Sequence, residues 1–321
     1  MNDINSVAVI IQQREGFEEE FERCQKSVER AINRADWKTY YKIFTSKNAS
    51  KEDIILQNLG ELKEFNLITF VDASDYVNKR FFETLPREYD KNTVLAAECF
   101  TTQCNGSYLY LERLNGFAGT YISSEYGPII PIFEDGNCPL DCHVWGYFYP
   151  SNLILKDSFI KIISENRDRM GSCVYWSFFT KNENLRVRIL PNSRYYHMAI
   201  RVMETEKQII TCGGFEHYLE TYPFMKLAHE INSKFPLHDL GFPGRAYDTN
   251  LYSTSIEYGD VHMFNSIFII ITDFNEIREA GGFTKQESQL IKSEILDSVK
   301  GSNLEAKIVH EEFWKLLNGE A

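Results

Sequence analysis

The chain has 321 residues, of which 43% are hydrophobic and 25% are charged, and its formal net charge at pH 7 is -12. This length suits one large α/β domain, or a domain with an appendage. The acidic balance disfavours non-specific binding to nucleic acid or to anionic membranes. No apolar run reaches the roughly 18 to 20 residues that cross a bilayer, so we expect no transmembrane segment.

The first strand-like run begins at Ser6, which leaves no room for a basic region and an apolar region of a secretory signal. We therefore expect a cytoplasmic protein, either free or peripheral to the inner face of the membrane.

Seven cysteines occur, and the odd number together with the missing signal favours reduced thiols. Cys99 and Cys104, with Cys138, Cys142 and His143, would be the ligands of an alternative structural zinc site. Their spacings are loose and their surroundings are apolar, so ordinary buried thiols are the favoured interpretation.

The first half of the chain alternates strand and helix patterns. Ser6 to Gln13 and Thr39 to Thr45 are β-branched and aromatic runs, and Phe17 to Arg34 between them has an apolar helical face. Ser50 and Asp53 are spaced to cap a second helix. This order predicts parallel strands with right-handed crossovers. The chain carries no P-loop, no dinucleotide fingerprint and no Gly-x-Ser-x-Gly elbow.

A third strand, Leu67 to Val71, ends in Asp72-Ala73-Ser74-Asp75, and a helical pattern resumes at Asn78. Two carboxylates at the end of a buried strand repel each other, and an apolar neighbourhood makes their ionisation costlier. A divalent cation or a set of donors would relieve both problems, and ligands of open α/β sheets bind beyond the carboxyl ends of strands. The segment indicates a site, although Asp75 is also placed to cap the following helix.

This segment resembles the strand-end motif of family 2 glycosyltransferases with the GT-A fold. Gln57-Asn58-x-Gly60, upstream, is similar to the Arg-Asn-x-Gly that opens the helix before that strand. Gln57 stands where Arg is common, and Ser74 stands where a metal-binding Asp is common. The resemblance implies a GT-A-like α/β fold, with a Rossmann-like and mostly parallel sheet flanked by helices, over residues 1–205. We expect residues 206–321 to form an α-rich C-terminal extension.

The resemblance also implies an activity. The protein would transfer a sugar from a nucleotide-sugar donor, expected to be UDP-linked, to a glycan or glycolipid acceptor in cell-surface polysaccharide or glycoconjugate synthesis. Mn²⁺ or Mg²⁺ would be held by Asp72 and Asp75, and Ser74 is a weaker ligand than a carboxylate. The residues that would contact the nucleotide are Gln12, Gln13, Arg14, Ser46, Asn58 and Asp72.

The sequence leaves the identity of the catalytic base open. The resemblance would place an acidic pair before Trp176, where Gly171 and Ser172 stand instead. Asp168, on the helix expected from Asp157, and Asp135, in a loop bounded by Gly and Pro, are the candidates, and each also fits a solvated surface carboxylate. A retaining enzyme, or a non-catalytic protein that binds a glycan or a partner enzyme, remains the alternative.

Three arginines, Arg186, Arg188 and Arg194, recur at alternate positions of a predicted strand, which places them on one face. They would hold a diphosphate or an anionic acceptor, or they line a solvated strand face. His197, which follows them, is a candidate phosphate contact, although a lone histidine near aromatics is more often structural.

Trp145, Tyr147 and Tyr149 also alternate, and such a face stacks on sugars or packs in a core.

In the extension, Phe215 to Phe235 has a helical period, and Phe264 to Thr272 is too apolar a strand to stand alone. We expect the extension to pack on the first domain or to form a homodimer.

Overall fold

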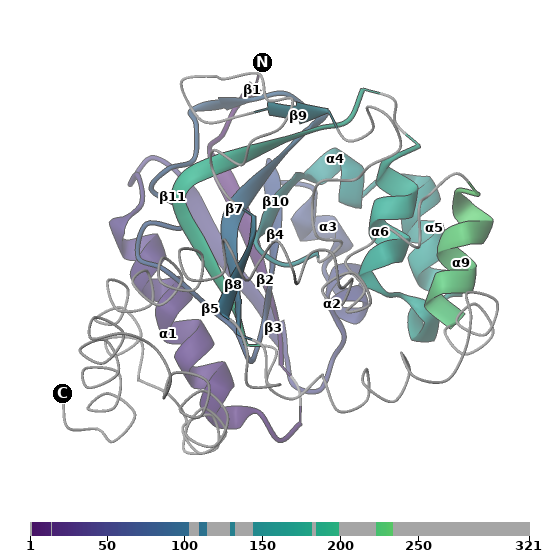
Figure 1. The fold of residues 1–321 in the computed structure, drawn as a ribbon, viewed down its shortest axis with the longest axis horizontal. Coiled ribbons are helices and arrows are strands. Elements are labelled where there is room, and N and C mark those ends of the chain that lie inside the picture. Colours follow the sequence, from purple (N-terminus) through teal and green to yellow (C-terminus); the bar gives the residue numbers. More distant parts are fainter. Residues whose placement is uncertain are drawn as a thin grey trace, which may run out of the picture.

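The structure is a computed structural model that describes residues 2–13, 15–102, 109–113, 129–131, 144–181, 184–198 and 223–233. A nine-stranded sheet runs through it in the order β3-β2-β4-β10-β7-β11-β5, with β8 beside β7 and β9 beside β11 (Figure 1). Its strands are β2 (Ser6–Gln12), β3 (Tyr40–Ser46), β4 (Leu67–Asp72), β5 (Tyr76–Val77), β7 (Thr93–Thr102), β8 (Leu109–Arg113), β9 (Ile129–Pro131), β10 (Tyr147–Pro150) and β11 (Arg186–Met198). A separate two-stranded sheet pairs β1 (Asn2–Asp3) with β6 (Glu88–Tyr89).

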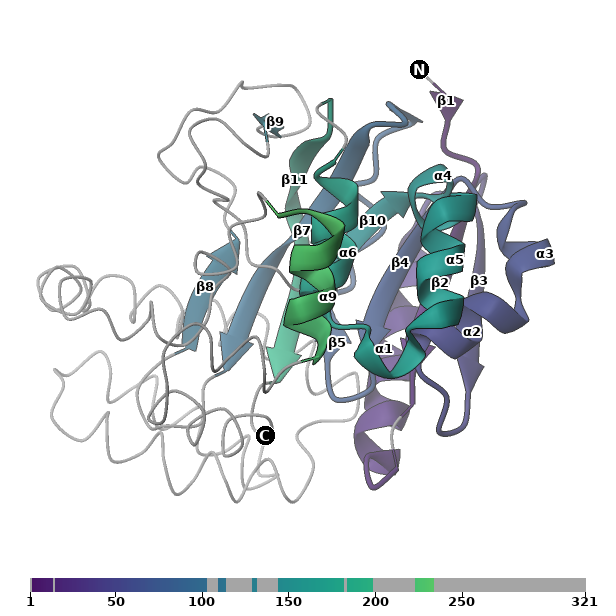
Figure 2. The same cartoon turned by 90° about the vertical axis from the view of Figure 1, so that its right-hand side faces the viewer.

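Helices cover both faces of the nine-stranded sheet. Helix α1 lies on one face, and the other described helices lie on the opposite face (Figures 1 and 2). The helices are α1 (Glu18–Arg34), α2 (Lys51–Gln57), α3 (Leu59–Leu62), α4 (Ser151–Ile154), α5 (Asp157–Glu165), the 3₁₀ helix η1 (Arg167–Arg169), α6 (Ser172–Phe179) and α9 (Pro223–Ile231). The predicted α/β class, a sheet flanked by helices, is confirmed.

The parallel part of the sheet follows from its sequence. Strand β2 is buried over Ser6 to Ile11 and pairs in parallel with β3 and β4, as a continuous apolar run predicts. Helix α2 begins with the predicted capping box, in which the Ser50 hydroxyl and the Asp53 carboxylate each bond the other's backbone N–H. The remaining long parallel pairing joins β7 to β11, whereas β10 runs antiparallel to β4 and β7.

Strand β10 sends alternate aromatic rings to the two faces of the sheet. The Tyr147 ring contacts Trp176 of α6 at 5.0 Å between centroids, whereas the Phe148 ring contacts Phe81 on the opposite face at 4.8 Å. Trp145, Tyr147 and Tyr149 are all buried in the core. Core packing therefore accounts for this aromatic alternation, and its interpretation as a sugar platform is not supported.

The prediction of a helix that begins at Asn78 is wrong. Tyr76 and Val77 pair with β11 instead, and the segment that follows is a series of turns. Asn78 exchanges backbone and side-chain hydrogen bonds with Arg194: its N–H donates to the Arg194 carbonyl (3.0 Å), and its amide oxygen accepts from the Arg194 N–H (3.1 Å). These tertiary bonds replace the helix that local propensity favours.

One part of the expected C-terminal extension is described, and it packs on the first domain. In α9, Leu227 and Ala228 are buried, and the Ser177 hydroxyl of α6 donates to the Ala228 carbonyl. The Asn232 side chain donates to the Thr180 hydroxyl (3.2 Å). The expected strand at Phe264 to Thr272 and the later helices lie outside the described residues. Within those residues, no helix is long and apolar enough to cross a bilayer.

Candidate functional site

Three parallel strands end together at one edge of the sheet. In the strand register, Gln12 at the end of β2 pairs with Ser46 at the end of β3 and with Asp72 at the end of β4. The N–H of Ala73 also donates to the Gln12 carbonyl (3.1 Å). The structure therefore brings together three of the predicted site residues at the carboxyl edge, where open α/β sheets bind ligands.

The segment from Asp72 to Asp75, which we call the carboxylate turn, is closed by the first of its two acids. One carboxylate oxygen of Asp72 accepts hydrogen bonds from the N–H (3.1 Å) and the hydroxyl (3.0 Å) of Ser74. The Asp75 N–H donates to the Asp72 carbonyl (3.0 Å). Asp72 is only 2% exposed, so these local donors stabilise a carboxylate that has lost most of its water.

The second acid, Asp75, is fully buried and bonded to a distant tyrosine. The Tyr195 hydroxyl donates to the Asp75 carboxylate and accepts from the Asp72 N–H (3.1 Å). Burial, and then the charges of Asp75 and Asp72, raise the pKa of Tyr195 well above its usual value. Tyr195 therefore keeps its proton and serves as the donor. No role was predicted for this tyrosine from the sequence.

Gly146 allows Tyr195 to reach the carboxylate turn. Its backbone has φ +67, and an added Cβ would lie 2.8 Å from both Cβ and Cγ of Tyr195. Its N–H bonds the Phe70 carbonyl (3.2 Å), which fixes it beside β4. The glycine is thus required by its left-handed conformation and by the close approach of the ring.

Helix α1 also contacts the carboxylate turn. The buried guanidinium of Arg23 donates to the Ser74 carbonyl (2.5 Å), and the Cys24 thiol donates to the Asp72 carbonyl (3.4 Å). Periodicity predicted an apolar face on this helix but did not single out Arg23. The sequence feature that could have identified Arg23 is a charged residue within the buried stripe of an amphipathic helix.

The other predicted contacts lie in different places. Gln13 is half-buried just after β2, whereas Arg14 and Asp135 lie outside the described residues. Asn58 ends α2, where its side chain donates to the Ile54 carbonyl (2.8 Å). Asp168 is exposed and lies on the 3₁₀ helix η1, not on the helix expected from Asp157.

The prediction that three arginines share one face of β11 is wrong. The register shifts between Leu190 and Arg194, so Arg194 pairs with Glu98 and takes the face opposite to Arg186 and Arg188. Its Nε lies 3.5 Å from the Glu98 carboxylate. His197 belongs to β11, and its side chain lies outside the described residues.

A buried ionic cluster at the start of α2 was not predicted. The Lys51 ammonium lies 2.8 Å from the Glu52 carboxylate, which also accepts from the Tyr175 hydroxyl (2.9 Å). The ammonium lies 5.4 Å from the Trp145 ring and 5.3 Å from the Tyr175 ring. Burial raises the pKa of the neighbouring Cys173 thiol to about 12. The cluster joins α2 to α6 through charge, a hydrogen bond and ring contacts.

The structure offers carboxylate and hydroxyl oxygens at the carboxylate turn, which are the donor types that Mg²⁺ and Mn²⁺ prefer. Across the described segments, the carboxylate turn included, no group of three or more His, Cys, Asp or Glu side chains is arranged to hold a metal ion. Cys104, Cys138, Cys142 and His143 of the alternative zinc site lie outside those segments, and Cys24 and Cys173 within them are buried and form no disulfide.

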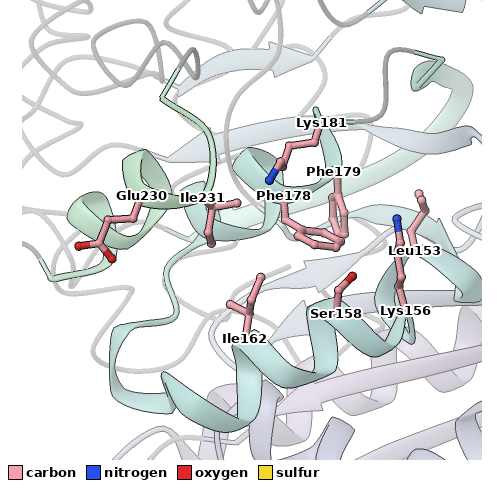
Figure 3. A pocket seen from close by; sticks show the side chains of 9 residues that line it. All are labelled: Leu153, Lys156, Ser158, Ile162, Phe178, Phe179, Lys181, Glu230 and Ile231. Atoms are coloured by element: carbon pink, nitrogen blue, oxygen red, sulfur yellow. The ribbon is translucent and has the colours of Figure 1, made fainter.

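A groove of about 680 Å³ lies among α5, α6 and α9 (Figure 3). It is lined by Leu153, Lys156, Ser158, Ile162, Phe178, Phe179, Lys181, Glu230 and Ile231. Its charged and hydroxyl groups are all exposed, and it contains none of the predicted site residues. We assign no ligand to it.

No protein-family model and no curated protein matches the sequence. Among solved structures, the chain is similar to S. aureus TarS 1-349 in complex with UDP-GlcNAc, at 12% identity and a TM-score of 0.33, over 98% of this chain and 89% of that one. The complex of the same fragment with UDP gives 13% identity, a TM-score of 0.34 and the same coverage. S. aureus TarS gives 14% identity and a TM-score of 0.28, over 91% and 54%. These TM-scores are too low to carry an argument about fold or activity.

Proposed function

We propose that this protein is a glycosyltransferase that takes a sugar from a nucleotide-sugar donor, with the nucleoside diphosphate bound at the carboxyl edge of β2, β3 and β4. The observation that carries the proposal is the register that places Gln12, Ser46 and Asp72 side by side at this edge. The resemblance of Asp72 to Tyr76 to the strand-end motif of GT-A enzymes supports it.

In this proposal, Asp72 and Asp75 are the acids that hold a divalent cation against the diphosphate, with a UDP-linked sugar as the expected donor. Mg²⁺-type sites commonly use one or two carboxylates together with substrate phosphate oxygens. The bound ion would neutralise charge on the leaving diphosphate. Asp72 is held by the donors of Ser74, and Asp75 by the hydroxyl of Tyr195, so both carboxylates are positioned before any ligand arrives.

We also propose that the acceptor is a glycan or glycolipid of cell-surface polysaccharide synthesis, and that the extension forms a homodimer. Neither Asp168 nor the start of α6 provides a buried catalytic carboxylate. Asp168 is exposed on η1, and Gly171 and Ser172 occupy the start of α6, where the resemblance would place an acidic pair.

These two observations, together with Ser74 in the carboxylate turn, favour a second candidate: a GT-A-like protein that binds a nucleotide or a glycan without transferring a sugar. An enzyme and a nucleotide binder differ in turnover and not in nucleotide binding, whereas a glycan binder need not bind the nucleotide.

A thermal-shift screen of nucleoside diphosphates, with and without Mn²⁺, tests binding at the site. We expect UDP to raise the unfolding temperature, and Mn²⁺ to increase that rise. Release of UDP from UDP-sugars, measured with and without acceptor glycans, then separates an enzyme from a binder. Asp168→Asn tests the base: loss of turnover with an unchanged UDP-induced shift would assign that role to Asp168, and unchanged turnover would exclude it. No shift with any nucleoside diphosphate would contradict the glycosyltransferase and the nucleotide binder, and would leave a protein that binds a glycan.

A further inference from the structure

Arg23 of α1 is a buried arginine whose guanidinium lies against the carboxylate turn. It is 2% exposed, and its Nη2 donates to the Ser74 carbonyl at 2.5 Å. The guanidinium carbon lies 5.0 Å from the centroid of the Tyr76 ring, and that ring stacks on Tyr196 at 4.6 Å and 11°. Arg23 therefore links the turn to α1, β5 and β11 at once.

The charge of Arg23 has a counterpart in the same place. An arginine side chain stays protonated, so burying it is costly unless anionic groups are close. The two carboxylates of the turn, on Asp72 and Asp75, are 2% and 0% exposed. Ser74, whose carbonyl accepts from the guanidinium of Arg23, lies between these two acids in the turn. Arg23 offsets part of the negative charge of the turn.

The hydrogen bond to Ser74 has a geometric consequence. Ser74 directs its N–H and its hydroxyl to the same carboxylate oxygen of Asp72, and its carbonyl accepts from Arg23. Arg23 thus holds the carbonyl of Ser74, and the N–H and hydroxyl of Ser74 in turn hold the Asp72 carboxylate. If the carbonyl were released, the Ser74–Asp75 peptide could rotate, and its N–H, on Asp75, would leave the Asp72 carbonyl that it bonds at 3.0 Å. Because that bond closes the turn, Ser74 and its two donors to the Asp72 carboxylate would then be held less firmly.

We propose that Arg23 is a positioning residue for the nucleotide site: it fixes the Ser74 peptide so that the Asp72 carboxylate is presented in one orientation. This role rests on the proposed function, because it concerns the same site. Arg23 acts through Ser74 and need not touch the nucleotide.

Ser27 of α1 provides a matched control. Its hydroxyl donates to the Cys24 carbonyl (2.7 Å), and its oxygen accepts from the N–H of Val77 (3.1 Å). Ser27→Ala therefore removes a buried hydrogen bond between the same helix and the same segment, just beyond the carboxylate turn. This variant measures the effect on binding of a weakened contact with α1 while Arg23 still holds the Ser74 carbonyl.

The first test compares Arg23→Met, Arg23→Lys and Ser27→Ala by calorimetric titration with UDP and Mn²⁺. We expect Arg23→Met to weaken binding by about 10- to 100-fold, as loss of an outer partner of a metal ligand typically does. Arg23→Lys, which keeps a charged donor, should recover most of that loss, and Ser27→Ala should bind like the wild type. Wild-type affinity in a folded Arg23→Met protein, or an equal loss in Ser27→Ala, would overturn the proposal.

The second test needs no nucleotide and separates this proposal from the proposed function. Amide hydrogen exchange at Ser74, whose N–H is bonded to Asp72, should be faster in Arg23→Met than in the wild type and unchanged in Ser27→Ala. Unchanged exchange in Arg23→Met would refute the positioning role. If the wild type fails to bind UDP, the proposed function fails, and the exchange rates still decide whether Arg23 orders the turn.

Discussion

The hydroxyl of Tyr195 donates a hydrogen bond to the carboxylate of Asp75, 120 residues earlier in the chain. Its oxygen also accepts from the backbone N–H of Asp72 (3.1 Å). One side chain of β11 therefore contacts both acidic residues of the carboxylate turn. A carboxylate without exposed surface needs such donors, because the water that would otherwise stabilise its charge has been removed.

Replacement of Tyr195 by phenylalanine should destabilise the protein by about 1–3 kcal/mol, because it leaves a buried carboxylate and a buried N–H without this partner. Urea unfolding measures the loss. Tyr149→Phe is the control: that buried hydroxyl donates to the neutral Val144 carbonyl (3.1 Å), so its loss should cost about 1 kcal/mol or less. Equal costs in the two variants would mean that the charge of Asp75 adds nothing to the bond.

Gly146→Ala should cost at least about 1–3 kcal/mol, the range for a residue other than glycine in a left-handed conformation, because its Cβ also meets the Tyr195 ring. The displaced ring should weaken UDP binding as well. Gly60→Ala, in α3, has nothing within 4 Å of the added Cβ and should stabilise the protein by up to about 1 kcal/mol. Similar unfolding free energies for the two variants would contradict the close approach of Tyr195.

Sequence periodicity predicted the elements whose burial follows a pattern along the chain itself. The runs that became β2, β4 and α1 are long and strongly patterned, and their bounds agree with expectation within a residue or two. The helix expected at Asn78 failed because its bonding partner, Arg194, comes from β11. The link from Tyr195 to the carboxylate turn could not be predicted for the same reason: no local pattern encodes a contact across 120 residues.

Glu52→Gln should destabilise the protein by about 3–5 kcal/mol, because it leaves the buried Lys51 ammonium without its counter-ion. The double variant Lys51→Met/Glu52→Gln should recover part of this loss, since neither charge remains. Exposed Glu165, which pairs with Lys161 at 3.8 Å, provides the control, and Glu165→Gln should change stability by less than about 0.5 kcal/mol. An effect of Glu52→Gln as small as that of Glu165→Gln would rule out the buried ion pair.

Stability should fall at alkaline pH, in part through Cys173. Its pKa rises from 9.0 to about 12 on folding, because burial disfavours the thiolate. A group whose pKa is raised in the folded state stabilises the protein below its unfolded pKa, so this contribution, up to about 4 kcal/mol, is lost between about pH 9 and pH 12. Urea unfolding at several pH values should show a shallower decline for Cys173→Ala than for the wild type. The neighbouring Ser172→Ala should decline like the wild type, and an unchanged slope in Cys173→Ala would contradict the assignment.

The central claim is that Asp72 presents its carboxylate to a nucleoside diphosphate, and the most direct measurement is calorimetric titration of UDP with Mn²⁺ into the wild type, Asp72→Asn and Ser74→Asp. Asp72→Asn retains an acceptor for the donors of Ser74, so it should fold normally and lose most of its UDP affinity. Ser74→Asp adds a carboxylate beside the other two and should bind Mn²⁺ more tightly. Wild-type UDP affinity in a folded Asp72→Asn protein would contradict the account.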